Sequence, residues 1–261
     1  MPSAPVIEVE HLSKSYASRD GRDIVAVDGI SFTVSAGSCT ALLGGNGAGK
    51  TTTISMLLGL LLPSAGRVAL LGVDMQHDRY RVLSRINFSS PYVELPHRLT
   101  VRENLRIYGD LYGLDDVAGR IDTLASELGF AALLDRPAGR LSAGQKTRVA
   151  LAKAMLNEPE VLLLDEPTAS LDPDTADRMR GFLEEYRDST GAAILMASHN
   201  MAEVERLCDV VLMMRAGRIV DRGAPADLIA RYGRQNLEEV FLDIARDTGA
   251  GGSGTRREAA S

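Results

Sequence analysis

The sequence has 261 residues, of which 45% are hydrophobic and 25% are charged, the balance of an ordinary globular protein rather than of a disordered one. Its formal net charge of -6 argues against binding to the phosphate backbone of nucleic acids, so no nucleic-acid partner is expected. The longest apolar runs, such as Met56–Leu62, fall well short of the about 20 residues that cross a bilayer as a helix. The first residues also lack the basic start and apolar core of a secretion signal, so we expect a cytoplasmic protein.

The N-terminal segment is predicted to form strands. Apolar and polar residues alternate in Val6–Val9 and Ile30–Val34, as in half-buried strands of an antiparallel layer. Cys39–Leu43 is a short apolar strand that leads directly into a glycine-rich loop, and a helical pattern follows over residues 50–62. The order is therefore strand, glycine loop, helix.

The glycine-rich loop fits the pattern G-x-x-x-x-G-K-[ST], in which converging backbone N–H groups surround a phosphate. Lys50 can reach the β- and γ-phosphates, and the Thr51 hydroxyl can bind Mg²⁺. The alternative is a plain turn between strand and helix. The predicted nucleotide-binding residues are Gly44, Gly45, Asn46, Gly47, Ala48, Gly49, Lys50, Thr51 and Thr52.

The next part of the chain is mainly helical. After a predicted strand at Val68–Leu71, residues 79–159 carry apolar residues at helical spacing, in Val101–Leu114 and Ala118–Leu128. We therefore predict an inserted helical subdomain. Near its end, Ser142 precedes the helical run Lys146–Leu156, so its hydroxyl can cap this helix or turn towards a phosphate.

Two acids follow a strand that is apolar throughout. Val161–Leu164 is typical of a buried parallel strand, and ligands gather at the carboxyl ends of such strands. We assign Asp165 to Mg²⁺ and Glu166 to polarising the attacking water. The alternative is that both acids simply end the strand in solvent.

The remainder completes an α/β core. A helix over Pro173–Thr190 precedes a strand at Ala192–Ala197, which gives a βαβ rhythm. Gly217–Gly223 predicts a hairpin, and a further helix is expected between Leu237 and Ala245. We expect one domain over residues 1–246, followed by a mobile glycine-rich tail over residues 247–261.

Taken in order, these motifs resemble the nucleotide-binding domain of ABC transporters over nearly the whole chain. Gly44–Thr51 matches the Walker A motif and Val161–Glu166 the Walker B motif. Leu141–Gln145 matches the family signature, with Ala143 in place of a glycine. The resemblance implies a P-loop NTPase core with a parallel sheet, an antiparallel β layer and the inserted helical subdomain, with ATP and Mg²⁺ as ligands.

The resemblance also assigns roles to residues outside the two Walker motifs. His199 corresponds to the switch histidine and counts as catalytic with Glu166, although a lone histidine is more often structural. Tyr16 corresponds to the aromatic residue that stacks on adenine, and Ser170–Asp172 to the D-loop. Ser142, Gly144 and Gln145 are expected to bind the nucleotide of a second copy in a head-to-tail pair.

One departure from the family pattern concerns metal binding and coupling. Family members carry a glutamine before the helical subdomain that touches Mg²⁺ and relays the nucleotide state to the membrane partner. Alignment on Leu99–Leu105 puts that position at Ser90 or Pro91, where no glutamine occurs.

The predicted terminal helix indicates which branch of the family the chain resembles. Leu237–Leu242 resembles the end of ATPases that serve export permeases of drugs, lipids or polysaccharides. The predicted function is an ATP-hydrolysing subunit that powers a separate transmembrane permease, peripheral on the inner face of the cell membrane. One alternative is a module that ATP merely joins into pairs, with weak hydrolysis. Another is an ABC ATPase acting on ribosomes or DNA, although the second cassette or coiled-coil insertion common in those proteins is not visible.

Overall fold

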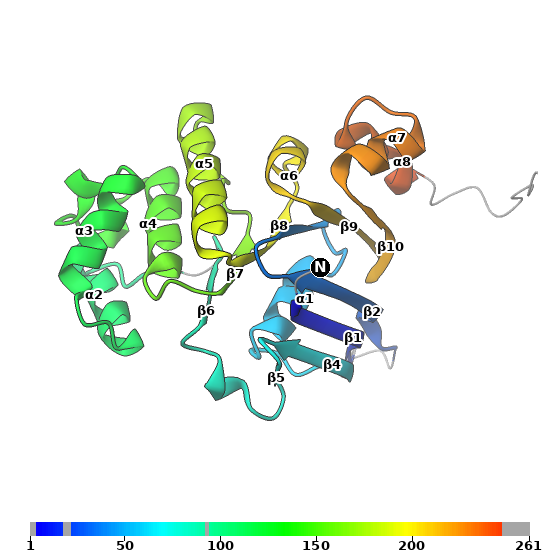
Figure 1. Cartoon of the computed structure of the whole chain (residues 1–261), viewed down its shortest axis with the longest axis horizontal. Helices are drawn as coiled ribbons and strands as arrows, with labels where there is room; N and C mark the ends of the chain where they lie inside the picture. The colour runs from blue at the N-terminus through cyan, green and yellow to red at the C-terminus, as the bar shows by residue number, and fades with distance from the viewer. Residues whose placement is uncertain (1–3, 18–21, 92–93, 247–261) are drawn as a thin grey trace, which may run out of the picture.

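The computed structural model describes residues 4–17, 22–91 and 94–246, which form two sheets surrounded by helices (Figure 1). The smaller sheet is antiparallel and has the strand order β2-β1-β4-β5. Its strands are β1 (Pro5–Tyr16), β2 (Ile24–Ser35), β4 (Ala65–Leu70) and β5 (Val73–Asp74). The antiparallel layer predicted from alternating residues is therefore confirmed, with longer strands than the sequence indicated.

The larger sheet has six strands in the order β10-β9-β3-β8-β7-β6. All its pairs are parallel except β9 with β10. Every residue of β3, β7 and β8 is buried, as expected where helices or another sheet cover both faces. The strands are β3 (Cys39–Leu43), β6 (Ile86–Ser89), β7 (Val161–Asp165), β8 (Ala193–Ser198), β9 (Val210–Arg215) and β10 (Arg218–Gly223).

Helices group on different sides of the sheets (Figure 1). Helices α2, α3 and α4 lie together at one end, α7 and α8 lie at the other, and α5 and α6 stand between them. The helices are α1 (Lys50–Leu57), α2 (Val101–Tyr112), α3 (Val117–Glu127), α4 (Ala143–Met155), α5 (Pro173–Thr190), α6 (Met201–Leu207), α7 (Pro225–Tyr232) and α8 (Leu237–Arg246), with short 3₁₀ turns at Arg79–Arg81, Ala131–Leu133 and Ala138–Arg140.

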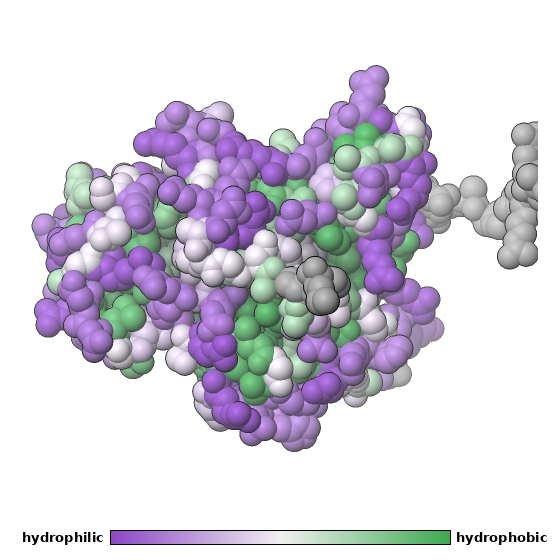
Figure 2. All heavy atoms as spheres, in the orientation of Figure 1, coloured by the Kyte–Doolittle hydropathy of each residue, from purple (hydrophilic) through white to green (hydrophobic). Residues whose placement is uncertain are grey.

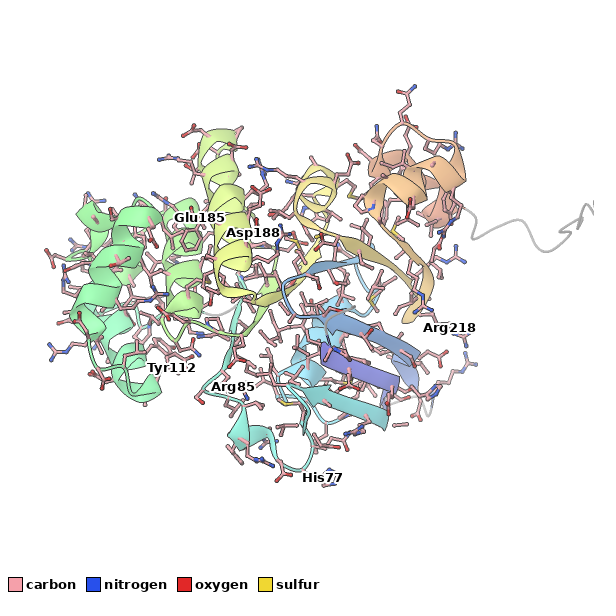
Figure 3. All side chains as sticks on the ribbon, in the orientation of Figure 1. His77, Arg85, Tyr112, Glu185, Asp188 and Arg218 are labelled. Atoms are coloured by element: carbon pink, nitrogen blue, oxygen red, sulfur yellow. The ribbon has the colours of Figure 1, made fainter. Side chains whose placement is uncertain are left out.

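Two apolar cores hold these layers together. One lies between the two sheets and α1 and includes Ile7, Leu42 and Leu57, all fully buried. The other joins the opposite face of the six-stranded sheet to the remaining helices and includes Leu105 and Leu164. At the edge of the sheets, Arg218 of β10 forms a salt bridge of 2.6 Å with Asp28 of β2 (Figure 3). The doubly packed sheet thus fixes the loop Gly44–Thr51, called the phosphate loop below for its predicted ligand, and the two acids Asp165 and Glu166 at the end of β7.

Two elements differ from the expectation. The interval 79–159, expected to be helical, contains β6, which pairs with β7 and extends the parallel sheet. The helix expected over residues 50–62 ends at Leu57, because Gly59 takes a left-handed conformation with φ of 67°. Leu60 and Leu62 beyond it are 70% and 62% exposed. The predicted helix at Pro173–Thr190 and strand at Cys39–Leu43 are confirmed to the residue.

The surface is mostly hydrophilic in the view of Figure 2, with hydrophobic residues gathered near α1 and β4. Within the described ranges, no helix has both the length and the apolar character needed to cross a membrane. The tail over residues 247–261, predicted to be mobile, lies outside the described residues.

Candidate nucleotide-binding and catalytic site

The phosphate loop connects β3 to α1, and its glycines are needed for both conformation and space. Gly47 and Gly49 have φ of 77° and 103°, values that side chains rarely allow. A Cβ on Gly49 would lie 2.5 Å from the carbonyl oxygen of Ala26 in β2, and one on Gly44 would lie 2.5 Å from that of Met214 in β9. The loop is therefore held between the two sheets.

Lys50 and the start of α1 make this loop a site for anions. The Lys50 Nζ donates to the carbonyl oxygens of Gly44 at 2.6 Å and Gly45 at 3.3 Å, so the ammonium lies over the loop. Burial lowers the Lys50 pKa, while Glu166 and Asp165 oppose this shift. Because Gly49 at the N-cap has no side chain, no side-chain cap occupies the first N–H groups of α1, around Thr52, and a helix N-terminus of this kind favours an anion.

Asp165 and Thr51 meet beside the loop. The Thr51 Oγ1 donates to Asp165 Oδ2 at 3.3 Å, which joins α1 to the end of β7. Burial raises the Asp165 pKa, and the neighbouring Glu166 raises it further, while Thr51 and Lys50 oppose both effects. The residues fit Mg²⁺, because that ion takes oxygen ligands and usually needs only one or two protein groups besides phosphate and water. Among the described residues no cluster of three acids, histidines or cysteines forms a self-sufficient metal site.

Glu166 and His199 form a pair at the ends of β7 and β8. His199 Nδ1 lies 2.7 Å from Glu166 Oε1, with the Glu166 side chain 18% exposed and that of His199 74% exposed. Glu166 has a φ of 52°, a left-handed conformation that costs a non-glycine residue about 1–3 kcal/mol. Its N–H donates to the carbonyl oxygen of Ala197 at 2.8 Å, which holds the strained backbone to β8. The side chain is thereby directed away from the strand and towards the histidine.

Tyr16 is the last residue of β1, and the sheet register brings it near the phosphate loop. It pairs with Ile24, two residues from Ala26, against which Gly49 packs. The side chain is 42% exposed, and the Lys14 Nζ lies 5.3 Å from its ring centroid. An exposed aromatic ring at this place is compatible with the adenine role that the resemblance implied.

The signature segment Leu141–Gln145 contains the N-cap and first turn of α4. The Ser142 hydroxyl accepts from the Gln145 N–H at 3.3 Å, and the Gln145 side chain accepts from the Ser142 N–H at 3.0 Å, which is a capping box. A Cβ on Gly144 would lie 2.8 Å from the carbonyl oxygen of Ser170, so this glycine allows the helix to approach the predicted D-loop. In the described parts of the chain, no hydrogen bond or ion pair joins these three predicted nucleotide-binding residues to the phosphate loop.

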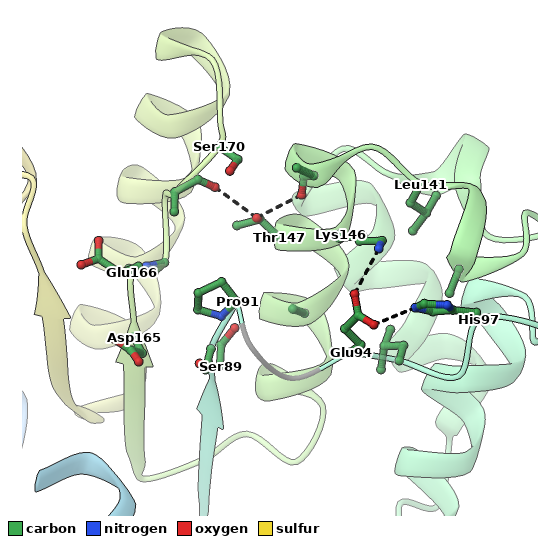
Figure 4. A pocket seen from close by; sticks show the side chains of 17 residues that line it. Ser89, Pro91, Glu94, His97, Leu141, Lys146, Thr147, Asp165, Glu166 and Ser170 are labelled. Carbon is green, nitrogen blue, oxygen red and sulfur yellow. Dashed lines mark hydrogen bonds and ion pairs between the residues drawn. The ribbon is translucent and has the colours of Figure 1, made fainter. Parts of the chain in front are cut away.

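A pocket of about 340 Å³ separates α4, which begins at the signature segment, from Asp165 and Glu166 at the end of β7 (Figure 4). Ser89, Ser90 and Pro91 line it with Asp165, and Ser90 and Pro91 are the two candidate positions of the family glutamine. Across the pocket, Glu94 bonds to Lys146 at 3.5 Å and to His97 at 3.0 Å. Lys146, followed by His97, lowers the pKa of Glu94. Thr147 on α4 donates to the carbonyl oxygen of Ala169 at 3.1 Å, which ties the two walls together (Figure 4).

Sequence reasoning missed two buried ionisable residues near this site. Glu203 on α6 is 1% exposed and Lys153 on α4 is 6% exposed. The only signal for Glu203 was its position three residues after Asn200, which predicts a helix cap rather than a buried carboxyl. Lys153 gave no signal, because a lysine in an amphipathic helix normally faces solvent.

Comparison with known proteins matches residues 27–169, more than half of the chain, to the family described as ABC transporter. The chain belongs to the ABC transporter family. It is 38% identical over 248 residues to a Nod factor export ATP-binding protein I of Ralstonia nicotianae, covering 92% of this chain and 74% of that protein. It is 35% identical over 228 residues to the ABC transporter ATP-binding protein NatA of Bacillus subtilis, covering 86% and 92%.

A solved structure described as the ATP binding subunit of an ABC transporter supports the same assignment. It superposes on 92% of this chain and 99% of its own with a TM-score of 0.81 and 28% identity. The predicted P-loop NTPase core of this ABC chain is thereby confirmed, together with its antiparallel layer and parallel-rich sheet. The predicted family is also confirmed.

Proposed function

We propose that this ABC subunit binds ATP with Mg²⁺ on the loop Gly44–Thr51 and hydrolyses it with Glu166 and His199. The observation that carries the proposal is that one loop and three side chains converge at the carboxyl ends of β3, β7 and β8. The loop before α1 supplies phosphate donors, Asp165 ends β7, Glu166 follows it, and His199 lies 2.7 Å from Glu166. These groups match the needs of phosphoryl transfer, in which positioning and charge stabilisation dominate.

Each side chain has a defined task in this proposal. Lys50 neutralises charge on the β- and γ-phosphates, and Tyr16 offers its ring to the adenine. Thr51 and Asp165 would hold Mg²⁺, which when bound neutralises charge developing on the phosphates. Glu166 accepts a proton from the attacking water, while the exposed His199 donates to the γ-phosphate. Gly47 and Gly49 keep the loop open for close approach of the phosphates.

The second half of the site comes from another copy of the chain. Ser142, Gly144 and Gln145 lie at the N-terminus of α4, whose positive end favours a phosphate. In a head-to-tail pair, two such ends complete two nucleotide sites at once, and a two-fold arrangement is the commonest closed symmetry. ATP between the copies stabilises the pair and its hydrolysis weakens it, which gives an opening and closing movement.

The membrane partner is a separate permease, and the transport direction is export. The relatives named Nod factor export ATP-binding protein support export, since they match most of this chain at 38–40% identity. The subunit then acts at the cytoplasmic face of the membrane, attached through the permease. The alternative of a pairing module with weak hydrolysis is disfavoured by the close contact between Glu166 and His199.

Phosphate release from ATP by the purified chain tests this function. Hydrolysis that requires Mg²⁺ and disappears in Glu166→Gln is the expected result. ATP binding and pairing without phosphate release in the wild type would support the pairing module instead. Copurification of a transmembrane protein with the chain from its native membrane would test the permease.

A further inference from the structure

A buried carboxyl lies behind the proposed catalytic pair and takes no part in the mechanism above. Glu203 is 1% exposed, and burial raises its pKa. Its Oε2 accepts from the Ser198 hydroxyl at 2.8 Å. Its Oε1 has no hydrogen-bond partner within the part of the chain that the structure describes, although the Thr168 hydroxyl lies close enough to lower the pKa of this carboxyl.

Ser198 connects this carboxyl to the switch histidine. The Ser198 oxygen that donates to Glu203 also accepts from the Asn200 N–H at 3.0 Å. The Asn200 side chain in turn caps α6 by accepting from the Glu203 N–H at 3.3 Å. These three hydrogen bonds close a ring through Ser198, Asn200 and Glu203, and His199 lies in the sequence between the first two. Because residues 198 and 200 are both fixed, the backbone of His199 has little freedom to turn.

The other side of Glu203 faces the segment that carries Glu166. Thr168 lies two residues after Glu166, and its hydroxyl lowers the Glu203 pKa. Arg180 on α5 lowers it as well, whereas the charge of Glu166 raises it. The carboxyl is therefore buried between α6 and the end of β8, with charged and polar groups of α5 and of the segment after β7 near enough to shift its pKa. A leucine of similar size would fill this space, but it would leave the Ser198 hydroxyl without its acceptor.

We propose that Glu203 is a positioning residue, whose buried carboxyl holds the turn of Ser198, His199 and Asn200 against the segment after β7 and keeps His199 on Glu166. This inference rests on the function proposed above, in which Glu166 and His199 act together. It assigns Glu203 no contact with ATP. Its effect passes through Ser198 to the orientation of the imidazole.

The first test measures the side-chain nitrogen shifts of His199 by NMR in nucleotide-free protein, assigned with His199→Gln. Glu203→Leu and Ser198→Ala are expected to move these signals in the same direction as Glu166→Gln, because each separates the imidazole from its carboxylate. Glu205→Leu is the matched control, since Glu205 on the same helix accepts from the Leu237 N–H and faces α8. His199 signals identical to wild type in both Glu203→Leu and Ser198→Ala would overturn the inference.

The second test measures ATP turnover in the same variants. We expect kcat to fall about 10- to 100-fold in Glu203→Leu while the ATP Kd stays within about twofold of wild type. In a His199→Gln background, Glu203→Leu should cause less than about a twofold further loss, whereas additive losses would show a role independent of His199. If Glu203→Leu does not fold, Ser198→Ala serves both tests. A wild-type chain without turnover, but with responsive His199 signals, would refute the proposed function and leave the positioning role intact.

Discussion

The proposed function places phosphate at both the phosphate loop and the signature end of α4, yet the chain itself orders these two regions to different degrees. The loop is locked between two sheets, and Glu166 beside it is held in a strained backbone conformation by a bond to β8. Ser142 and Gln145, by contrast, are satisfied by a local capping box at the surface. The difference teaches that the first region is organised by its own chain, whereas the second is an ordinary helix end, to which the proposed function gives a role only when a second copy of the chain supplies the phosphate.

The largest expected effect concerns the region that the chain organises itself. Glu166→Gln keeps the size of the side chain but removes the base, so kcat should fall about 10²- to 10⁴-fold while ATP still binds. Single-turnover phosphate release and ATP titration measure the two quantities. ATP-loaded pairs should accumulate in this variant and be visible by sizing. Wild-type turnover would move the catalytic role elsewhere, with His199 as the next residue to test.

Ser142→Arg addresses the region that a second copy must complete. A bulky cation at the helix start should block access of the partner's nucleotide and lower turnover about 100-fold, an effect typical of a central interface residue. ATP affinity of the single chain should not change, because its own loop is intact. Sizing of Glu166→Gln with ATP, with and without Ser142→Arg, measures the pairing. Normal hydrolysis by Ser142→Arg, or ATP-loaded protein that stays monomeric at high concentration, would contradict the shared site.

Lys50→Ala tests the phosphate loop through its affinity for ATP. The ammonium makes charge-assisted hydrogen bonds to phosphate, and loss of a hydrogen bond to a charged group costs about 1.5–3 kcal/mol, or about 10- to 100-fold in Kd. Lys146→Ala is a matched control, since Lys146 is a half-buried lysine whose ion pair is to Glu94. Unchanged ATP affinity in Lys50→Ala would argue that the loop is not the phosphate site.

The sequence was most informative where local pattern and tertiary structure agree. The apolar runs of β3 and β7 and the glycine loop were predicted because burial and chemistry both mark them in a few adjacent residues. Strand β6 was missed because Ile86–Ser89 mixes polar and apolar residues and its partner β7 lies more than 70 residues away. Glu203 was missed for a related reason. A carboxyl is placed on the polar face of a helix by sequence reasoning, and only the fold shows Ser198 and Thr168 behind it.

Lys153 is the second buried ionisable residue that sequence reasoning missed, and it lies between α4 and β6. Lys153 on α4 lies over the rings of Phe88 at 4.7 Å and Tyr108 at 5.2 Å. Its Nζ donates to Asn87 Oδ1 at 3.3 Å and to the carbonyl oxygen of Phe88 at 3.4 Å. Tyr112, on α2 (Figure 3), also faces Asn87. The Lys153 ammonium thus links α4 to β6, next to Ser89, which lines the pocket. Burial lowers the pKa of Lys153 to about 8.

The smallest expected effect is the pH dependence that this lysine adds to stability. Its pKa is about 8 in the folded state against 10.5 for the free side chain, so between these values the unfolded state holds more protons. The Lys153 contribution to the free energy of unfolding should therefore rise with pH, by about 1–2 kcal/mol between pH 7 and 9.5 at 1.36 kcal/mol per pKa unit. Urea unfolding of wild type and Lys153→Met measures it, with Lys146→Met as the control from the same helix, because the Lys146 side chain is far less buried. Because other lysines titrate in both proteins, the quantity to compare is the difference in slope. Parallel curves of unfolding free energy against pH for wild type and Lys153→Met would show that water between α4 and β6 solvates the buried ammonium. The link between these two elements would then depend on packing alone.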